Sequence, residues 1–240
     1  MKRKLKILLL AGNTSRAKSY AQILAKNTSQ NEVQGLFFGH AEKEYAVPTL
    51  DEHTLDFLEK NGLFVPDLSE SLDHTFQKRE WSFTHIHTAD ANGEEVLSMI
   101  ASTQCDIVVF AGYGGQILKE PHFYLGKKYL HMHPGELPIE RGSTTIYYSI
   151  LNKRQCSVTA FYMTEKIDAG EDVLCQTYPL PKRGVNIDAW FDNIIRADCL
   201  ERTIEIIGNQ NDVLQKTNAR SEEYYVIHPV LKHVALLSLK

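Results

Sequence analysis

The stretch Lys4–Asn13, KLKILLLAGN, is a short run of aliphatic residues that ends in a Gly-Asn turn. An apolar run of this length is typical of a strand that is buried on both faces of a sheet. Arg16–Lys26 follows with apolar side chains at helical spacing, and Glu32–Phe38 is again rich in β-forming residues. A strand, a helix and a second strand in this order indicate a parallel sheet covered by helices.

The same alternation continues along the chain and predicts an α/β fold with a doubly wound, mostly parallel sheet. Asp106–Ala111, DIVVFA, is the clearest further strand, whereas residues 62–80 show no clear period and are expected to be loop with short elements. The other expected elements are helices over Leu50–Asn61, Glu94–Ser102 and Ser143–Leu151 (capped by Gly142 or Ser143), strands over Ser82–His87 and Lys128–His133, a hairpin-like pair over Ser157–Met163 and Val173–Tyr178, an amphipathic helix over Ile187–Gly208, and an apolar tail over Glu222–Leu239.

The 240 residues suffice for one large domain with a short appendage. We expect residues 1–185 to form the main domain and residues 186–240 a short C-terminal helical extension packed on it. The net charge is −4 without clustered Lys and Arg, which gives no reason to expect a nucleic-acid partner. No apolar run approaches transmembrane length, and four cysteines without a CxxC pair favour free thiols. A cytoplasmic protein with no membrane partner is therefore expected.

Polar turns follow three of the predicted strands, at Gly12–Ser15, Gly112–Gln116 and His131–Gly142. Ligands of doubly wound sheets bind outside the carboxyl ends of the strands, so these turns should meet at one site. His131 and His133 lie two residues apart at a strand end, which places both on one face of the strand. An imidazole titrates near neutrality and can act as a general acid or base. A lone histidine more often satisfies a turn, but two within HxHPGxLPxxRG favour catalysis.

Asp168 lies in Ile167–Gly170, between two β-rich runs. The purely structural interpretation is that Asp168 forms an Asx-turn beside a glycine, which is common. The functional interpretation is a carboxylate that orients an imidazole and raises its basicity. Sequence spacing alone leaves both interpretations open.

The run Leu130–Gly142 resembles the active-site strand and loop of the formyltransferases that use 10-formyltetrahydrofolate, which include glycinamide ribonucleotide, methionyl-tRNA and sugar-nucleotide enzymes. In that family the strand ends in Asn-x-His-Pro, and a Leu-Pro and an Arg-Gly pair follow. Val158–Gly170 is similar to the second family signature, which ends in Asp-x-Gly. Phe110–Tyr113 with Ile117 and Leu118 resembles the folate-side loop, and Gly12–Ser15 the first loop, which meets acceptor phosphate in the ribonucleotide enzyme. The matches cover roughly residues 1–185 in the family's order.

The resemblance implies a one-carbon transferase with 10-formyltetrahydrofolate as formyl donor and with no metal. It implies that His131, His133 and Asp168 are catalytic, with His131 at the position of the family asparagine. That asparagine helps to hold the formyl oxygen as it becomes an oxyanion, and an imidazole can also donate one hydrogen bond. The residues expected to contact the folate are Phe110, Gly112, Tyr113, Ile117, Leu118, Thr164 and Ile167. Those expected to bind the acceptor are Gly12, Asn13, Thr14, Gly135, Arg141 and Thr144.

The expected acceptor is a small-molecule amine, in the first place an amino sugar attached to a nucleotide. Transfer RNA is disfavoured because the chain lacks the length for the C-terminal β-barrel of the methionyl-tRNA enzymes and lacks a basic surface. Glycinamide ribonucleotide is possible by size, but Thr14 stands where the first loop of that enzyme makes a tighter glycine-rich turn, and the family asparagine is replaced by His131. The alternatives are a formyl hydrolase, a metal-dependent variant that uses His131, His133 and Asp168 as two-His-one-carboxylate ligands, and a non-catalytic binding protein. The oligomeric state expected for the protein is a homodimer.

Overall fold

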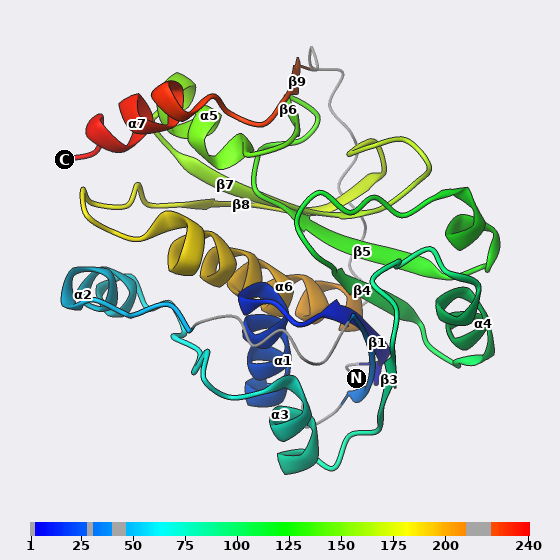
Figure 1. Ribbon diagram of the computed structural model, residues 1–240. Coiled ribbons are helices and arrows are strands. Elements are labelled where there is room, and N and C mark those ends of the chain that lie inside the picture. The colour runs from blue at the N-terminus through cyan, green and yellow to red at the C-terminus, as the bar shows by residue number, and fades with distance from the viewer. Residues whose placement is uncertain (1–2, 28–30, 40–46, 210–221) are drawn as a thin grey trace.

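The aliphatic run near the N-terminus forms β1 (Lys6–Gly12), at the centre of a seven-stranded sheet in the computed structural model, which describes residues 3–27, 31–39, 47–209 and 222–240. The strand order is β3-β2-β1-β4-β5-β7-β8. The first five of these strands pair in parallel, and β7 and β8 extend the sheet in antiparallel fashion (Figure 1). The predicted α/β fold with a doubly wound, mostly parallel sheet is confirmed.

The bounds of the elements follow the predicted order along the chain. The other strands of the large sheet are β2 (Glu32–Phe38), β3 (Phe83–Ile86), β4 (Ile107–Ala111), β5 (Lys128–His133), β7 (Cys156–Tyr162) and β8 (Glu171–Tyr178). A small second sheet pairs β6 (Glu140–Gly142) with β9 (Glu222–Tyr224). The helices are α1 (Ser15–Asn27), α2 (Glu52–Lys60), α3 (Leu72–Lys78), α4 (Glu94–Ser102), the 3₁₀ turn η1 (Glu120–Tyr124), α5 (Thr145–Lys153), the π-helical turn η2 (Ile187–Phe191), α6 (Asp192–Gly208) and α7 (Pro229–Leu237).

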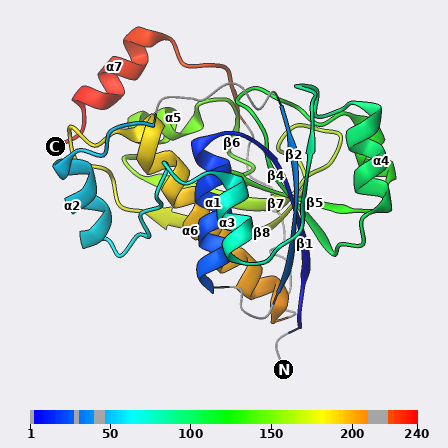
Figure 2. The ribbon, with the colours of Figure 1, turned by 60° about the horizontal axis from the view of Figure 1, so that its bottom comes forward.

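Helices cover both faces of the sheet (Figures 1 and 2). On one face, α1 and α6 pack against each other and against the sheet in the larger hydrophobic core. On the other face, α4 and the segment around Leu118 close a smaller core. Successive residues of β1 alternate between the two cores, since Leu9 faces the larger and Leu10 the smaller. This alternation explains why β1 is aliphatic throughout.

The strand order reverses direction at β1, because the chain first adds β2 and β3 on one side and then β4 and β5 on the other. A crevice at the carboxyl ends of the strands is expected at such a switch point. The turns after β1, β4 and β5 all lie at this edge, with Ala11 paired to Ala111 and Val109 to Leu130. The fold therefore brings the three polar turns to one side of the sheet.

Two predicted helices need correction. The helix expected from Ser143 begins at Thr145, and its N-cap Thr144 is left-handed with no side-chain capping bond. Its hydroxyl instead accepts a hydrogen bond from the Ile227 N–H at 2.8 Å, which sequence spacing could not reveal. The amphipathic helix expected over Ile187–Gly208 is split into η2 and α6, and α6 is buried on several sides because it lies between α1 and the sheet.

The C-terminal segment, residues 222–240, packs back on the larger hydrophobic core. Ile227, Ala235 and Leu239 are buried in the larger core, and α7 packs on α5. The expected extension was helical throughout. The structure differs, because β9 is a strand that pairs with β6 beside the predicted site loop.

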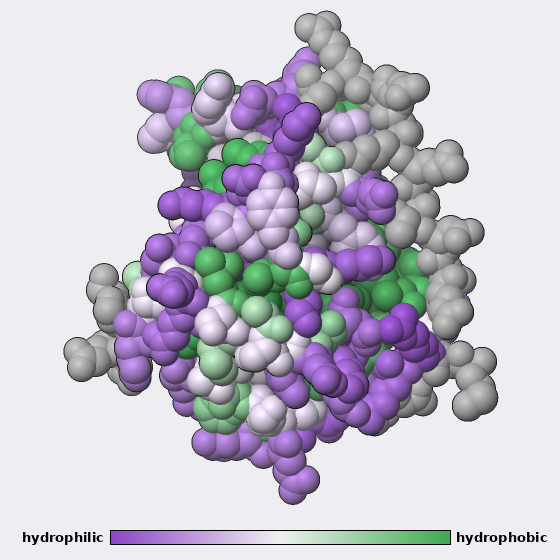
Figure 3. Space-filling model, turned by 90° about the vertical axis from the view of Figure 1, so that its right-hand side faces the viewer, coloured by the Kyte–Doolittle hydropathy of each residue, from purple (hydrophilic) through white to green (hydrophobic). Residues whose placement is uncertain are grey.

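The face in Figure 3 mixes hydrophilic side chains with small hydrophobic patches near its centre. In the part of the chain that the structure describes, no helix is long and apolar enough to cross a membrane.

Candidate active site

The end of β5 carries the two histidines, and β7 holds the loop that follows them. Leu130 and Met132 pack in the larger core, so alternation places His131 and His133 on the opposite face of the strand. The hydroxyl of Thr159 on β7 donates to the Gly135 carbonyl at 2.6 Å and accepts from the amide of residue 137 at 3.1 Å. Both main-chain groups of the turn are thereby fixed to the sheet.

His133 is almost completely buried and has a partner at each ring nitrogen. Its Nδ1 lies 3.5 Å from Oδ2 of Asp168, and its Nε2 lies 2.6 Å from the main-chain carbonyl oxygen of Glu140. A carbonyl oxygen can only accept, so Nε2 carries the proton and donates it. In the neutral ring Nδ1 is therefore the nitrogen with a free lone pair. Burial lowers the pKa of His133, although Asp168 and the Glu140 carbonyl act in the opposite direction.

Asp168 is presented by the turn between β7 and β8 in a left-handed conformation, with φ of 50°. Its Oδ2 also accepts a hydrogen bond from the Gly142 N–H at 2.8 Å, which links the two predicted signature loops. Gly170 makes the tight turn possible, because a Cβ there would lie 1.5 Å from the Tyr162 carbonyl oxygen. The turn therefore requires a glycine at this position of the Asp-x-Gly motif, because any side chain would clash with the backbone.

His131 lies between the rings of Phe110 and Phe161, with centroid distances of 6.3 and 5.9 Å. Its Nδ1 is buried and finds no hydrogen-bond partner among the described residues. Burial, and then the positive charges of Arg16 and Arg196, hold the pKa of His131 well below its ordinary value. The ring is consequently neutral at physiological pH and carries one proton.

Two arginines that the sequence analysis did not single out, the half-buried Arg16 and the buried Arg196, approach the same strand ends. Arg16 of α1 donates to the carbonyl of Gly112 after β4, and Arg196 of α6 donates to the carbonyl of Met132 on β5 at 3.1 Å. Arg196 is held by an ion pair with Asp192, one helical turn earlier, at 2.9 Å. The only sequence signal was this i, i+4 spacing, because burial of a guanidinium depends on tertiary packing.

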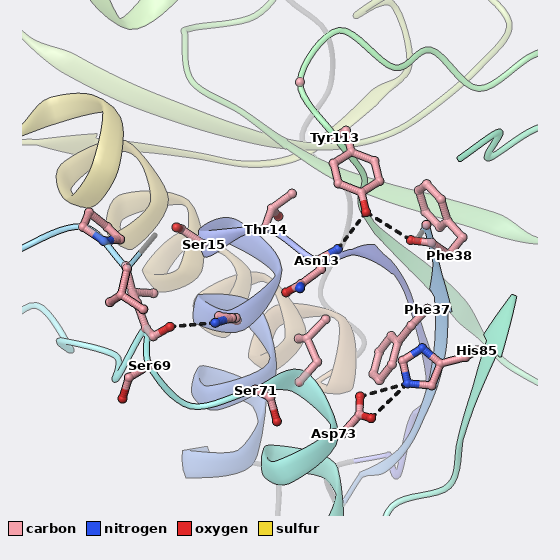
Figure 4. Close-up of a pocket in the computed structure, with 17 residues that line it drawn as sticks. Asn13, Thr14, Ser15, Phe37, Phe38, Ser69, Ser71, Asp73, His85 and Tyr113 are labelled. Carbon is pink, nitrogen blue, oxygen red and sulfur yellow. Dashed lines mark hydrogen bonds and ion pairs between the residues drawn. The ribbon is translucent and has the colours of Figure 1, made fainter. Parts of the chain in front are cut away.

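A cavity of about 900 Å³ opens beside the first loop (Figure 4). Its volume is within the range of small-molecule sites. In its wall the Nε2 of His85 lies 3.0 Å from both carboxylate oxygens of Asp73, and Lys18 donates to the Leu68 carbonyl. The lining residues that come from α1 and the turn before it are Asn13, Thr14, Ser15 and Lys18, and the others include Phe37, Phe38, Ser69, Ser71, Asp73, His85 and Tyr113.

The predicted residues fall into three groups in the structure. His131, His133, Gly135 and Asp168 lie together at the end of β5, with Phe110 against His131. Gly12, Asn13, Thr14 and Tyr113 lie together at the cavity, where the Tyr113 hydroxyl accepts from the Asn13 N–H at 3.3 Å.

The third group makes no contact that indicates a role at the His133–Asp168 pair or in the cavity. Thr144 is bonded to the C-terminal tail, and Arg141, paired with β9, has a buried Nε without a partner in the described part of the chain. Gly112 follows β4 and offers its carbonyl to Arg16. Leu118 is buried in the smaller core, whereas Ile117, Thr164 and Ile167 are exposed.

The residues missed by sequence reasoning include Asp73 and His85 in the cavity wall. Asp73 lies in the 62–80 region, where no periodicity was evident, and α3 is too short to produce one. Within the described ranges, no group of three or more His, Cys, Asp or Glu is arranged to hold a metal ion.

Sequence comparison finds relatives among the methionyl-tRNA formyltransferases, while no protein-family model matches the chain. The enzyme of Orientia tsutsugamushi is 33% identical over 101 residues, which are 40% of this chain and 32% of that protein. The chain thus matches about a third of the length of such relatives.

Comparison with solved structures finds the same fold. A sugar N-formyltransferase from Shewanella sp FDAARGOS_354 superposes with a TM-score of 0.60 and 17% identity, over 98% of this chain and 87% of the other. An N-formyltransferase from Helicobacter canadensis, in complex with folinic acid and dTDP-3-aminofucose, gives a TM-score of 0.55 and 18% identity, over 91% and 70% of the two chains. These likenesses establish the fold, which is that of the formyltransferases.

Proposed function

We propose that this chain, which is similar to methionyl-tRNA formyltransferases in sequence and to formyltransferases in fold, is an N-formyltransferase that moves a formyl group from 10-formyltetrahydrofolate to an amine. The observation that carries the proposal is the pairing of buried His133 with Asp168 at the carboxyl end of β5. A buried imidazole beside a carboxylate, at the switch point of a doubly wound sheet, is suited to proton transfer.

The residues present are compatible with the formyl donor. The buried Nδ1 of His131 has no partner among the described residues, which is an arrangement expected of a polar atom that meets a ligand. When bound, 10-formyltetrahydrofolate would supply the formyl group. On the predicted folate side, Phe110 and Leu118 are buried in the smaller core, whereas Ile117 beside them is an exposed apolar side chain.

The role of His133 follows from its hydrogen bonds. Formyl transfer makes a bond from the acceptor nitrogen to the formyl carbon and breaks the bond from that carbon to the folate nitrogen. The acceptor nitrogen must lose a proton and the folate nitrogen must gain one. Nδ1 of His133 has the free lone pair to take the proton, and Asp168 at 3.5 Å stabilises the imidazolium that forms.

The acceptor that we propose is an amino sugar attached to a nucleotide, bound in the cavity beside the first loop. Three features support this choice: the cavity volume of about 900 Å³, the aromatic walls of Phe37 and Tyr113, and the polar turn at Asn13 and Thr14. The acceptor in the Helicobacter canadensis complex is also a sugar nucleotide. A homodimer stays a prediction, which light scattering on the purified protein would test.

The experiment is to incubate the protein with 10-formyltetrahydrofolate and a panel of amino-sugar nucleotides, and to detect formylated products by mass spectrometry. We expect one class of amino-sugar nucleotide to be formylated, with stoichiometric release of tetrahydrofolate. Release at the same rate without any acceptor would instead establish a formyl hydrolase. Absence of release under every condition would refute the proposal.

A further inference from the structure

Glu140 is an almost completely buried acid, with 1% of its surface exposed, that neither family signature nor the proposed mechanism employs. It lies on β6, at the end of the loop that begins at Pro134. Its Oε2 accepts hydrogen bonds from the Ser149 hydroxyl at 2.7 Å and from the Glu136 N–H at 3.0 Å. Its Oε1 has no hydrogen-bond partner in the described chain, and Nζ of Lys153 lies 3.6 Å away. Burying a carboxylate costs free energy, so its presence in the interior calls for a physical reason.

The two ends of Glu140 hold two different parts of the site. The carboxylate ties the loop to α5 through Ser149, and the Glu140 N–H donates to the Glu136 carbonyl at 2.8 Å, which closes the loop on itself. The main-chain carbonyl of the same residue accepts a hydrogen bond from the Nε2–H of His133 at 2.6 Å. Any movement of the carboxylate would therefore move the acceptor that orients the imidazole.

Close packing leaves the loop little freedom to adjust. A Cβ at Gly135 would lie 3.0 Å from Nε2 of His133 and 3.1 Å from the Glu140 carbonyl oxygen. The hydroxyl of Thr145 donates to the Pro134 carbonyl at 2.6 Å, which fixes the start of the loop as Glu140 fixes its end. The imidazole is thus held in a tightly packed frame of main-chain atoms.

Glu140 also changes the electrostatics at His133. The charged or titratable groups that face this imidazole are Asp168, Glu140, Arg196 and His131. Asp168 and Glu140 raise the pKa of His133, whereas burial, the dominant effect, and Arg196 lower it. An imidazolium formed during proton transfer is therefore stabilised by two carboxylates, of which the Asp-x-Gly motif supplies only one.

We infer that Glu140 is a positioning residue for His133: it holds the ring with its proton on Nε2, so that Nδ1, beside Asp168, is the nitrogen that takes and returns the reacting proton. The catalytic meaning of this inference rests on the proposed formyl transfer. The geometric part, which is the tautomer and its dependence on Glu140, does not.

The test is Glu140→Gln, which preserves size and can still accept both hydrogen bonds but removes the charge. Glu136→Gln is the matched control, because Glu136 lies in the same loop and pairs with the same Lys153 at 2.8 Å, while its side chain does not touch His133. We expect Glu140→Gln to lower kcat by about tenfold with an unchanged KM for the formyl donor, which corresponds to about 1.4 kcal/mol. The acid limb of the kcat profile should move to lower pH, and Glu136→Gln should change neither parameter.

Histidine-selective ¹⁵N NMR on the protein without substrates separates this inference from the proposed function. The expected spectrum shows neutral His133 protonated on Nε2, with a mixed or shifted tautomer in Glu140→Gln. A ring protonated on Nδ1, or a Glu140→Gln protein with unchanged tautomer and pH profile, would overturn the inference. If Glu140→Gln does not fold, Ser149→Ala, which removes one hydrogen bond to the same carboxylate but keeps its charge, should shift the His133 tautomer in the same direction to a smaller extent. An unchanged tautomer in Ser149→Ala would equally overturn the inference.

Discussion

Nδ1 of His133 lies 3.5 Å from Oδ2 of Asp168, although one residue belongs to a strand and the other to a turn farther along the chain. His133 ends β5, and Asp168 lies in the turn between β7 and β8. Antiparallel pairing sets His133 opposite Thr159 and Leu130 opposite Tyr162, so the turn that follows Tyr162 has to fold back toward the end of β5 to bring Asp168 to His133. There the Gly142 N–H holds the Asp168 carboxylate in place. The dyad therefore depends on the path of the turn as well as on the pairing of the strands.

His131 stands at the family asparagine position, and His131→Asn should retain formyl transfer within about tenfold of the unsubstituted protein. The reason is that an asparagine amide can donate the hydrogen bond that an oxyanion requires, and one such donor is typically worth about 10²–10³ in rate. Steady-state kinetics of tetrahydrofolate release measure the effect. A complete loss of activity in a folded variant would mean that the imidazole has a role that an amide cannot fill.

Protein stability should decrease as the pH falls below about 6.5, the ordinary pKa of histidine. Burial lowers the pKa of both His131 and His133 in the folded state, so the unfolded chain binds more protons in this range. Stability is then fully present above the unfolded pKa and is lost as the pH approaches the lowered folded values. Urea denaturation between pH 5 and pH 8 tests this, and His131→Asn should reduce the slope. A slope of opposite sign in the unsubstituted protein would contradict the burial of neutral histidines.

Gly170→Ala should abolish formyl transfer and destabilise the fold. The added Cβ would lie 1.5 Å from the Tyr162 carbonyl oxygen, so the turn that presents Asp168 must change its path. Gly114→Ala is the stability control, because a Cβ at Gly114 meets no described atom within 4 Å. Thermal unfolding of the two variants should differ by several degrees, since about 1 kcal/mol shifts Tm by about 2–4 °C in a chain of this size. Equal unfolding temperatures would show that the turn tolerates a side chain.

Thr144→Val should cost about 1–3 kcal/mol of stability, because it leaves the Ile227 N–H without its partner. The acceptor KM should not change, since the Thr144 hydroxyl is already bonded to the C-terminal tail. Urea unfolding and acceptor kinetics on the same sample measure both quantities. A raised acceptor KM at unchanged stability would return Thr144 to the acceptor-binding residues that the sequence had suggested.

The parts of the fold that were predictable are those set by local pattern. The bounds of β2, α4 and β5 agree with the sequence-based expectation, because burial on one or both faces leaves a period in the sequence. The predicted start of α5 was wrong, because the Thr144 hydroxyl accepts a hydrogen bond from the N–H of Ile227, 83 residues away. A capping rule considers only neighbours in sequence and cannot detect such a competitor.

Only those residues of the candidate site that lie within a sequence motif were predictable. His133 and Asp168 lie in the two long signatures, and the structure brings them together. Arg16 and Glu140 give no signal in the sequence, and Arg196 gives only its i, i+4 spacing to Asp192. Charged residues are ordinarily solvated, and the burial of these three follows from how α1, α6 and β6 pack. Asp73 and His85 lie in neighbouring elements whose proximity depends on where α3 docks.

A double-mutant cycle over His133→Ala and Asp168→Asn, with tetrahydrofolate release as the measured rate, tests the central claim most directly. Residues that act as one unit give non-additive losses. We expect each single variant to lower kcat by about 10²–10⁴, the usual contribution of a positioned acid or base, and the double variant to be no worse than the more damaged single one. Near-normal formyl transfer by both single variants, or losses that add in full, would contradict a His133–Asp168 dyad.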